Sequence, residues 1–164
     1  MARSGSQAGP STPATVALTA AGIRFIAHTY VHDPATTNYG LEAATALELD
    51  PDRVFKTLLA EADGRLCVGI VPVTGMLDLK ALAAAVGAKR AVMADPAVAE
   101  RKTGYVVGGI SPIGQKTALP TVLDETAELW PTIYVSGGRR GFDIELAPGD
   151  LLAATSGQLA DIAR

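Results

Sequence analysis

The chain has 164 residues, of which 48% are hydrophobic and 19% charged, and its formal net charge is −3. This length and composition are typical of one soluble globular domain with a sizeable core. The single cysteine excludes an internal disulfide, and no apolar run approaches the roughly 18 residues of a membrane span. No apolar signal-peptide region is visible, which favours the cytoplasm. An acidic chain should bind nucleic acid weakly, through a local patch, or with a partner's help, because RNA-binding domains working alone are usually basic.

The N-terminal part is predicted to contain a tail, two helices and a strand. Residues 1–12 are rich in Gly, Ser, Ala and Pro without periodicity, so we expect a flexible tail ahead of a domain at 13–164. A helix should begin at Pro13 behind a Ser or Thr N-cap and stop at Gly22. The alternating run 23–32 predicts a strand, and "NYGLEAATALELD" predicts a helix that ends before a proline.

The rest of the chain is predicted to form two hairpins separated by helices. Two β-rich runs flank Asp63-Gly64, a pair typical of a type I′ turn, and a second hairpin is expected around 137–141. The other expected elements are helices over 77–87, behind the N-cap Asp95 and after residue 147, and short strands before Asp95 and over 118–125.

The order of these elements predicts the fold class. Helices are mixed with antiparallel hairpins, and no regular βαβ alternation is present, so a doubly wound parallel sheet is not expected. We expect an α+β fold: a single compact domain with a mixed, largely antiparallel, barrel-like β-sheet and flanking helices.

The most unusual stretch is "TGYVVGGISPIGQKT", residues 103–117, whose second half approaches a phosphate-binding loop. Gly109 and Gly114 have the required spacing, but Gln115 stands where such a loop needs its lysine. Pro120 interrupts any helix whose N-terminus would hold the phosphates. A nucleotide-phosphate loop is therefore not expected.

The glycines of this stretch still indicate a close approach between the backbone and another group. Gly108 and Gly109 can adopt positive φ, and consecutive exposed N–H groups can bind a carbonyl oxygen or an oxyanion. Ser111 adds a hydroxyl beside them. A plain tight turn between strands explains the glycines equally well.

Two charged residues stand out in apolar strands. Lys56 alternates with apolar neighbours in "VFKTLL", so it either reaches solvent at a strand edge or faces a negative ligand or carboxylate. Asp143 in "GFDIEL" lies on the face opposite the core-facing Phe142 and Ile144. It either belongs to a solvated face or pairs with Lys56 across the sheet.

The sequence gives little support to metal or thiol chemistry. His28 and His32 are four residues apart with Asp33 beside them, but no third ligand cluster exists, so we expect no metal and no cofactor. Tyr30, on the same strand face, is a candidate aromatic wall for a base or ribose. Cys67 lies in an apolar strand and is expected to be a buried small hydrophobe, without a nucleophilic triad.

Five blocks, in order, resemble the YbaK/EbsC family, and within it the YbaK-type Cys-tRNA(Pro) deacylase branch. They are "HTYVHDPATTNYG", "VFKTLL", "LDLKALAAAVGAK", "MADPAVAERKTGYVVGGISPIGQK" and "IYVSGGRRGFDIEL". The resemblance runs from about residue 13 to the C-terminus. It implies a fold like the editing domain of prolyl-tRNA synthetase and a trans-editing enzyme that clears Cys-tRNA(Pro), and also Cys-tRNA(Cys). Cysteine and proline are too similar in size for a binding pocket alone to separate them.

The resemblance also implies roles for particular residues. Catalytic roles fall on Lys56, Gly108, Gly109, Ser111 and Asp143, with the lysine near the tRNA 3′ end and the glycine loop holding the aminoacyl group. Substrate-binding roles fall on Tyr30, Tyr39, Thr57, Ile110, Pro112 and Lys116. Two departures are that the family often has phenylalanine at the position of Tyr39, and a second lysine at the position of Thr117.

The implied mechanism needs no protein nucleophile. The cysteine thiol of the substrate attacks its own ester and leaves as a cyclic thioester, while loop N–H groups stabilise the oxyanion. The implied partners are the aminoacylated tRNA 3′ end and, in a transient complex, prolyl-tRNA synthetase, with no membrane and no metal. Two alternatives stay open: deacylation of another mischarged tRNA such as Ala-tRNA(Pro), and non-catalytic binding of aminoacyl or nucleotide ligands.

Overall fold

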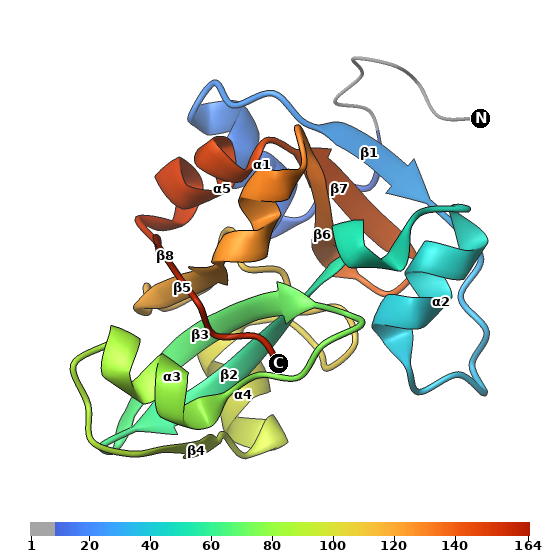
Figure 1. The fold of residues 1–164 in the computed structure, drawn as a ribbon. Helices are drawn as coiled ribbons and strands as arrows, with labels where there is room; N and C mark the ends of the chain where they lie inside the picture. The colour runs from blue at the N-terminus through green and yellow to red at the C-terminus, as the bar shows by residue number, and fades with distance from the viewer. Residues whose placement is uncertain (1–8) are drawn as a thin grey trace.

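The structure is a computed structural model, which describes residues 9–164; residues 1–8 lie outside the described part. Figure 1 shows the order of the elements. The α-helices are α1 Pro13–Ala20, α2 Tyr39–Ala46, α3 Leu79–Ala85, α4 Pro96–Thr103 and α5 Pro148–Thr155. The strands are β1 Ile26–Thr29, β2 Phe55–Ala62, β3 Arg65–Pro72, β4 Ala91–Met93, β5 Thr121–Asp124, β6 Ile133–Arg139, β7 Phe142–Leu146 and β8 Gln158–Ala160. Two 3₁₀ helices are η1 Pro51–Arg53 and η2 Glu125–Leu129.

The strands form two sheets. β1, β7 and β6 pair antiparallel in that order, and the second sheet has the order β4-β2-β3-β5-β8, with β5 parallel to both β3 and β8. A bridge between Val54 and Tyr134 connects the two sheets beside β2 and β6. The predicted α+β class is confirmed. The barrel does not close, because the two sheets are joined mainly by side-chain packing and not by strand pairing.

The main core fills the space between the sheets and is covered by α1 and α5. It includes Leu18 of α1, Ile70 of β3, Leu123 of β5, Ile144 of β7 and Leu151 of α5, all fully buried. A second cluster, with Leu82, Cys67 and Val122, packs α3 against the five-stranded sheet. Cys67 is therefore a buried small hydrophobe, as predicted.

The first helix is fixed by the residues immediately before it. The Thr12 side chain accepts a hydrogen bond from the Thr15 N–H, and the Thr15 hydroxyl accepts one from the Thr12 N–H, which forms a capping box. The Thr12 hydroxyl also donates to the carbonyl of Gly137, 2.5 Å away, and Thr12 is only 7% exposed. Thr12, the last residue of the predicted tail, is therefore held by hydrogen bonds to α1 and to Gly137 of β6.

The turn chemistry expected from the sequence is present. Asp63 and Gly64 both have positive φ, +49° and +80°, as a type I′ turn between β2 and β3 requires. Asp95 caps α4 by accepting the Ala97 N–H at 2.8 Å. The strand predicted over 23–32 is shorter, since only β1 pairs with β7 along its length.

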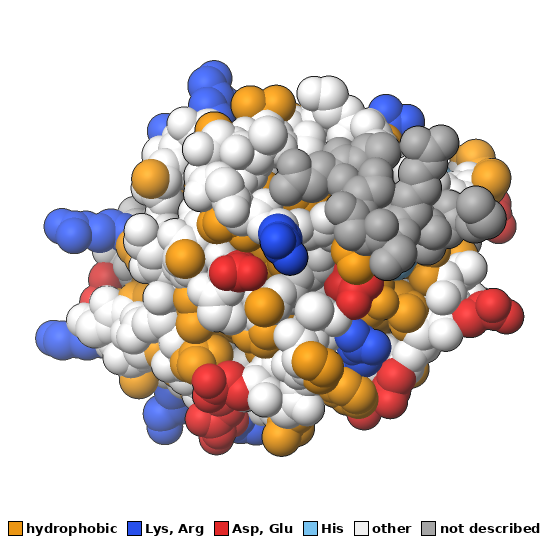
Figure 2. Space-filling view, turned by 90° about the horizontal axis from the view of Figure 1, so that it is seen from above, with side chains coloured by type: hydrophobic (Ala, Val, Ile, Leu, Met, Phe, Trp, Pro, Cys, Tyr) orange, Lys and Arg blue, Asp and Glu red, His pale blue; other side chains and the backbone are white. Residues whose placement is uncertain are grey.

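The charges on one face of the molecule are mixed. Figure 2 shows basic and acidic side chains interspersed with apolar and polar ones on the face seen from above. No sign of charge dominates this face, although the chain as a whole carries −3. No helix among residues 9–164 is long and apolar enough to cross a bilayer.

Asp124 should contribute strongly to stability, because its buried carboxylate holds the C-terminal segment. It accepts the N–H groups of Ile162 and Ala163, each at 2.9 Å, and bonds of the Thr126 hydroxyl and N–H. We expect Asp124→Ala to lower the free energy of unfolding by roughly 2–4 kcal/mol, measured by urea denaturation. Glu128→Ala, at an exposed carboxylate, is the control and should change it little. Equal effects of the two substitutions would contradict this role.

Candidate active site

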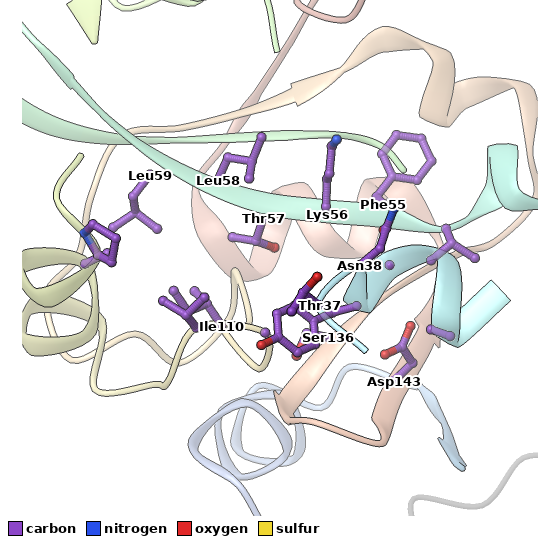
Figure 3. A pocket seen from close by; sticks show the side chains of 18 of the residues that line it. Thr37, Asn38, Phe55, Lys56, Thr57, Leu58, Leu59, Ile110, Ser136 and Asp143 are labelled. Carbon is purple, nitrogen blue, oxygen red and sulfur yellow. The ribbon is translucent and has the colours of Figure 1, made fainter. Parts of the chain in front are cut away.

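A pocket of about 480 Å³ opens between β2 and the β6–β7 hairpin. The start of α2 and the loop that follows α4 close its remaining sides. Figure 3 shows β2 on one side, Ser136 and Asp143 on the other, and Ile110 of the loop at the end of the pocket near Leu59. Seven predicted site residues line it: Tyr30, Tyr39, Lys56, Thr57, Gly108, Ile110 and Asp143. Four predicted residues do not line it: Gly109, Ser111, Pro112 and Lys116.

Thr57 is an unsatisfied polar group inside this pocket. Its hydroxyl oxygen is buried, and it is the only such side-chain oxygen or nitrogen without a hydrogen-bond partner among the residues that the structure describes. Buried polar groups nearly always have partners, so an unpartnered hydroxyl that lines a pocket indicates a ligand group that would complete it. Figure 3 shows the Thr57 side chain on the pocket side of β2.

Lys56 points the other way from the same strand. Figure 3 shows its side chain projecting from the side of β2 opposite to Thr57. Partial burial lowers the pKa of its ammonium, and Lys56 forms no ion pair with any residue in the range 9–164. The predicted pairing of Lys56 with Asp143 is therefore wrong, because the alternation of the strand separates the two groups.

Asp143 is a carboxyl group held away from water. It is 6% exposed, and burial raises its pKa from the ordinary 3.8 to about 7, with no neighbouring cation to offset the cost. Burial and the nearby Asp143 charge raise the pKa of the Tyr30 hydroxyl. Ser136 lies directly across the hairpin from Asp143 and also lines the pocket. Sequence reasoning missed Ser136, since one serine before two glycines is typical of turn chemistry.

The glycine loop presents its backbone to the pocket. The Gly109 N–H is already bonded to the Val106 carbonyl at 2.8 Å, which makes a tight turn. Within residues 9–164, the N–H groups of Gly108 and Ile110 form no hydrogen bond. Both residues line the pocket, so these two groups, and not that of Gly109, are the donors that the loop leaves unbonded beside the pocket, where an oxyanion would need them.

Arg140 joins the two sides of the pocket mouth, and the sequence reasoning did not single it out. Its guanidinium lies 4.9 Å from the centre of the Tyr39 ring and donates from Nη2 and Nε to the Val107 carbonyl, at 2.7 and 3.0 Å. A Cβ on Gly108 would lie 2.8 Å from the Tyr39 ring. Arg140 therefore holds α2 and the glycine loop in contact; its only sequence signal is the pair of arginines in the hairpin turn.

The remaining predicted residues have other surroundings. Ser111 is 0% exposed, and its hydroxyl accepts the Ile113 N–H at 3.3 Å, so in this structure it supports the loop from inside. Pro112 is also buried, whereas Lys116 is exposed beside the end of α4. The catalytic role predicted for Ser111 and the substrate-binding roles predicted for Pro112 and Lys116 stay predictions.

The two histidines have separate partners. His28 Nε2 lies 2.9 Å from Glu145 Oε1, and His32 Nδ1 lies 2.7 Å from Glu42 Oε1. Within residues 9–164, no three His, Cys, Asp or Glu side chains are arranged to hold a metal ion. Neither histidine lines the pocket, and among the described residues no hydrogen bond joins either imidazole to a hydroxyl, as a nucleophile–base pair would require.

The pocket thus combines a buried carboxyl and unbonded backbone N–H groups with no nucleophile–base pair among the described residues. The sequence profile of the aminoacyl-tRNA editing domain matches residues 33–154, which include every residue of this pocket except Tyr30. The chain belongs to this family, and within it to the YbaK/EbsC proteins, which are aminoacyl-tRNA deacylases.

Three relatives show the extent of the similarity. EbsC of Enterococcus faecalis, described as a candidate Cys-tRNA(Pro)/Cys-tRNA(Cys) deacylase, is 43% identical over 120 residues, 73% of each chain. The proline–tRNA ligase of Moorella thermoacetica is 38% identical over 73 residues, 44% of this chain and 13% of the ligase. A crystal structure of a candidate trans-editing enzyme for prolyl-tRNA synthetase has a TM-score of 0.79 and 28% identity, covering 95% of this chain and 99% of that one.

Gly108→Ala should disturb the pocket mouth more than a comparable turn substitution does. Gly108 and Gly64 have similar positive φ, +87° and +80°, but only a Cβ on Gly108 would meet a neighbour, the Tyr39 ring. We expect urea denaturation to show a loss of about 1 kcal/mol for Gly64→Ala and a larger loss for Gly108→Ala. In a Tyr39→Ala background, Gly108→Ala should cost no more free energy of unfolding than Gly64→Ala does. If Gly108→Ala cost as much in that background as in the presence of Tyr39, the ring contact would be unimportant.

Asp143→Asn should change how stability depends on pH. Because the pKa of Asp143 is raised in the folded state, the folded protein holds a proton that the unfolded chain has released between about pH 4 and 7. Wild-type stability should therefore decline through this window, and the variant should lack this component. Urea denaturation across the window measures both, with Glu128→Gln as an exposed control. Parallel profiles of wild type and Asp143→Asn would contradict the raised pKa.

Proposed function

We propose that this protein clears cysteine from Cys-tRNA(Pro), and from Cys-tRNA(Cys), by attack of the substrate's own thiol. The observation that carries the proposal is the unpartnered Thr57 hydroxyl, in a pocket that offers hydrogen-bonding groups but no activated protein nucleophile. Neither histidine lines the pocket, and the only cysteine is buried in the cluster under α3. The proposed nucleophile therefore comes from the substrate or from water.

The proposed step balances without a cofactor. The thiol of the cysteinyl group gives up its proton, its sulfur bonds to the ester carbonyl carbon, and the carbon–oxygen bond to the terminal ribose breaks. The ribose oxygen takes up a proton, which releases tRNA and a cyclic thioester that water later opens. The reaction is intramolecular, so the contribution of the pocket is to hold the thiol near the carbonyl.

Other pocket residues are proposed to stabilise the oxyanion and to bind the substrate. The N–H groups of Gly108 and Ile110 stabilise the developing oxyanion, and the Thr57 hydroxyl donates to or accepts from the aminoacyl group. With its pKa raised to about 7, the Asp143 carboxyl is partly protonated at neutral pH in the empty pocket. It ionises when the α-ammonium of the aminoacyl group enters, since an opposite charge favours the carboxylate. Lys56 mainly positions the 3′-terminal ribose or phosphate, because its ammonium has no partner in the described protein.

The choice of tRNA is proposed to come from a transient complex with prolyl-tRNA synthetase. A chain with a net charge of −3 should bind tRNA modestly on its own and with a steep salt dependence. One relative is itself a proline–tRNA ligase, which supports a connection with that enzyme.

The substrate's thiol should be essential for turnover. We expect the purified protein to release cysteine from Cys-tRNA(Pro) above the no-enzyme rate, and to leave Ala-tRNA(Pro) and a seryl analogue intact, because neither carries a thiol. Turnover of the alanyl substrate would instead favour a water nucleophile, and turnover of none would favour a binding module.

The isolated protein should treat Cys-tRNA(Cys) and Cys-tRNA(Pro) alike, and a strong preference would contradict the role of the synthetase.

Thr57→Val provides a variant for the same assay that separates chemistry from folding. The substitution removes a hydroxyl that has no partner in the protein, so stability should not fall, while kcat/KM should fall roughly tenfold. Thr19→Val, at an exposed threonine of α1, is the matched control.

A further inference from the structure

Five basic side chains gather around the loop that closes the pocket. Arg101 and Lys102 lie in the last turn of α4, Lys116 lies beside that turn, and Arg139 and Arg140 stand at the tip of the β6–β7 hairpin. All five are exposed. These residues are named the basic rim.

The first group of the rim is held together by backbone bonds. The N–H of Lys116 donates to the Thr103 carbonyl at 2.9 Å, and the N–H of Thr117 donates to the Lys102 carbonyl at 3.1 Å. A Cβ on Gly104 would lie 3.5 Å from the Lys116 Cβ. Lys116 therefore lies against the end of α4, next to the other two cations.

The second group lies against the far end of the same loop. A Cβ on Gly109 would lie 2.7 Å from the Arg139 Cα, and the Arg140 guanidinium is bonded to the Val107 carbonyl. The loop from Gly104 to Gly109 thus touches one group at each end, and six residues span at most about 20 Å. The pocket mouth, with Val107 and Gly108, lies on this loop between the two groups.

The rim is positive although the protein is acidic. It contains five of the chain's 14 basic residues, and Glu100, which accepts the Val107 N–H at 2.8 Å, is the acidic residue of the adjoining helix turn. No rim residue forms an ion pair with any residue of the described range. Compensation of the helix dipole accounts for Arg101 and Lys102 but not for Lys116, Arg139 and Arg140.

We propose that the basic rim binds phosphates of the tRNA acceptor end, next to the terminal nucleotide whose aminoacyl group enters the pocket. The inference rests on the proposed function, because a substrate bound by its 3′ end must leave the pocket at the mouth, where the rim begins. Two donors of the Arg140 fork are used by Val107, so others remain for phosphate oxygens. The rim supplies the local positive surface that an acidic chain needs to hold RNA.

Binding of uncharged tRNA(Pro) tests the rim without any catalysis. The double variant Arg101→Gln plus Lys102→Gln should bind more weakly, and the slope of log affinity against log salt should become shallower by roughly one for each phosphate that the variant no longer binds. The matched control is Arg65→Gln plus Lys80→Gln, which neutralises two exposed cations at the β2–β3 turn and on α3. Fluorescence anisotropy across a salt series measures both, and circular dichroism checks that the variants fold.

Activity assays separate this inference from the proposed function. We expect the ratio of kcat/KM for Cys-tRNA(Pro) to that for cysteinyl-adenosine, which lacks the phosphate backbone, to fall in the double rim variant and not in the control. If wild type hydrolysed neither substrate, the proposed function would be overturned. The salt dependence of tRNA binding would still show whether the basic rim binds phosphates. Equal slopes of log affinity against log salt for the rim and control variants would overturn the proposal that the basic rim binds phosphates. A weakening that appears only with prolyl-tRNA synthetase present would also overturn it, and would assign the rim to that protein.

Discussion

The pocket exists because the loop after α4 presses its backbone against an aromatic ring and a hairpin turn. Gly108 lies against Tyr39, and Gly109 lies against the backbone of Arg139, at distances that no Cβ would allow. Arg140 then fixes the contact by stacking on Tyr39 and binding the Val107 carbonyl. The N–H groups of Gly108 and Ile110 are left without hydrogen bonds beside the pocket, and donors fixed in the backbone need little rearrangement during a reaction.

The polar groups of this pocket are costly in the empty protein. Asp143 is buried without a cation, and Thr57 has no hydrogen-bond partner. Each arrangement opposes folding, because desolvation is not offset within the protein. An aminoacyl-tRNA end carries complementary groups: an α-ammonium, carbonyl and hydroxyl oxygens, and phosphates. The cost is concentrated where such a ligand would remove it, as is common at functional sites.

Much of the fold followed from local chemistry. Asp63-Gly64 gave the β2–β3 hairpin, because few residue pairs accept two positive φ angles, and Asp95 followed by proline marked the start of α4. The parallel pairing of β8 with β5 had no local signal, because it depends on Asp124 binding the backbone of the chain end. The residues paired across the pocket were predicted less well, and the expected contact of Lys56 with Asp143 does not form.

The sequence by itself determined the family, most of the elements and seven of the residues that line the pocket, since residue types, turns and ordered motifs are local properties. Only the tertiary structure decided which groups face each other. It placed Thr57 and Lys56 on opposite sides of one strand, buried Ser111 inside the loop, and brought Ser136 and Arg140 to the site. These outcomes depend on strand register and on packing between segments far apart in the chain, which no local pattern specifies.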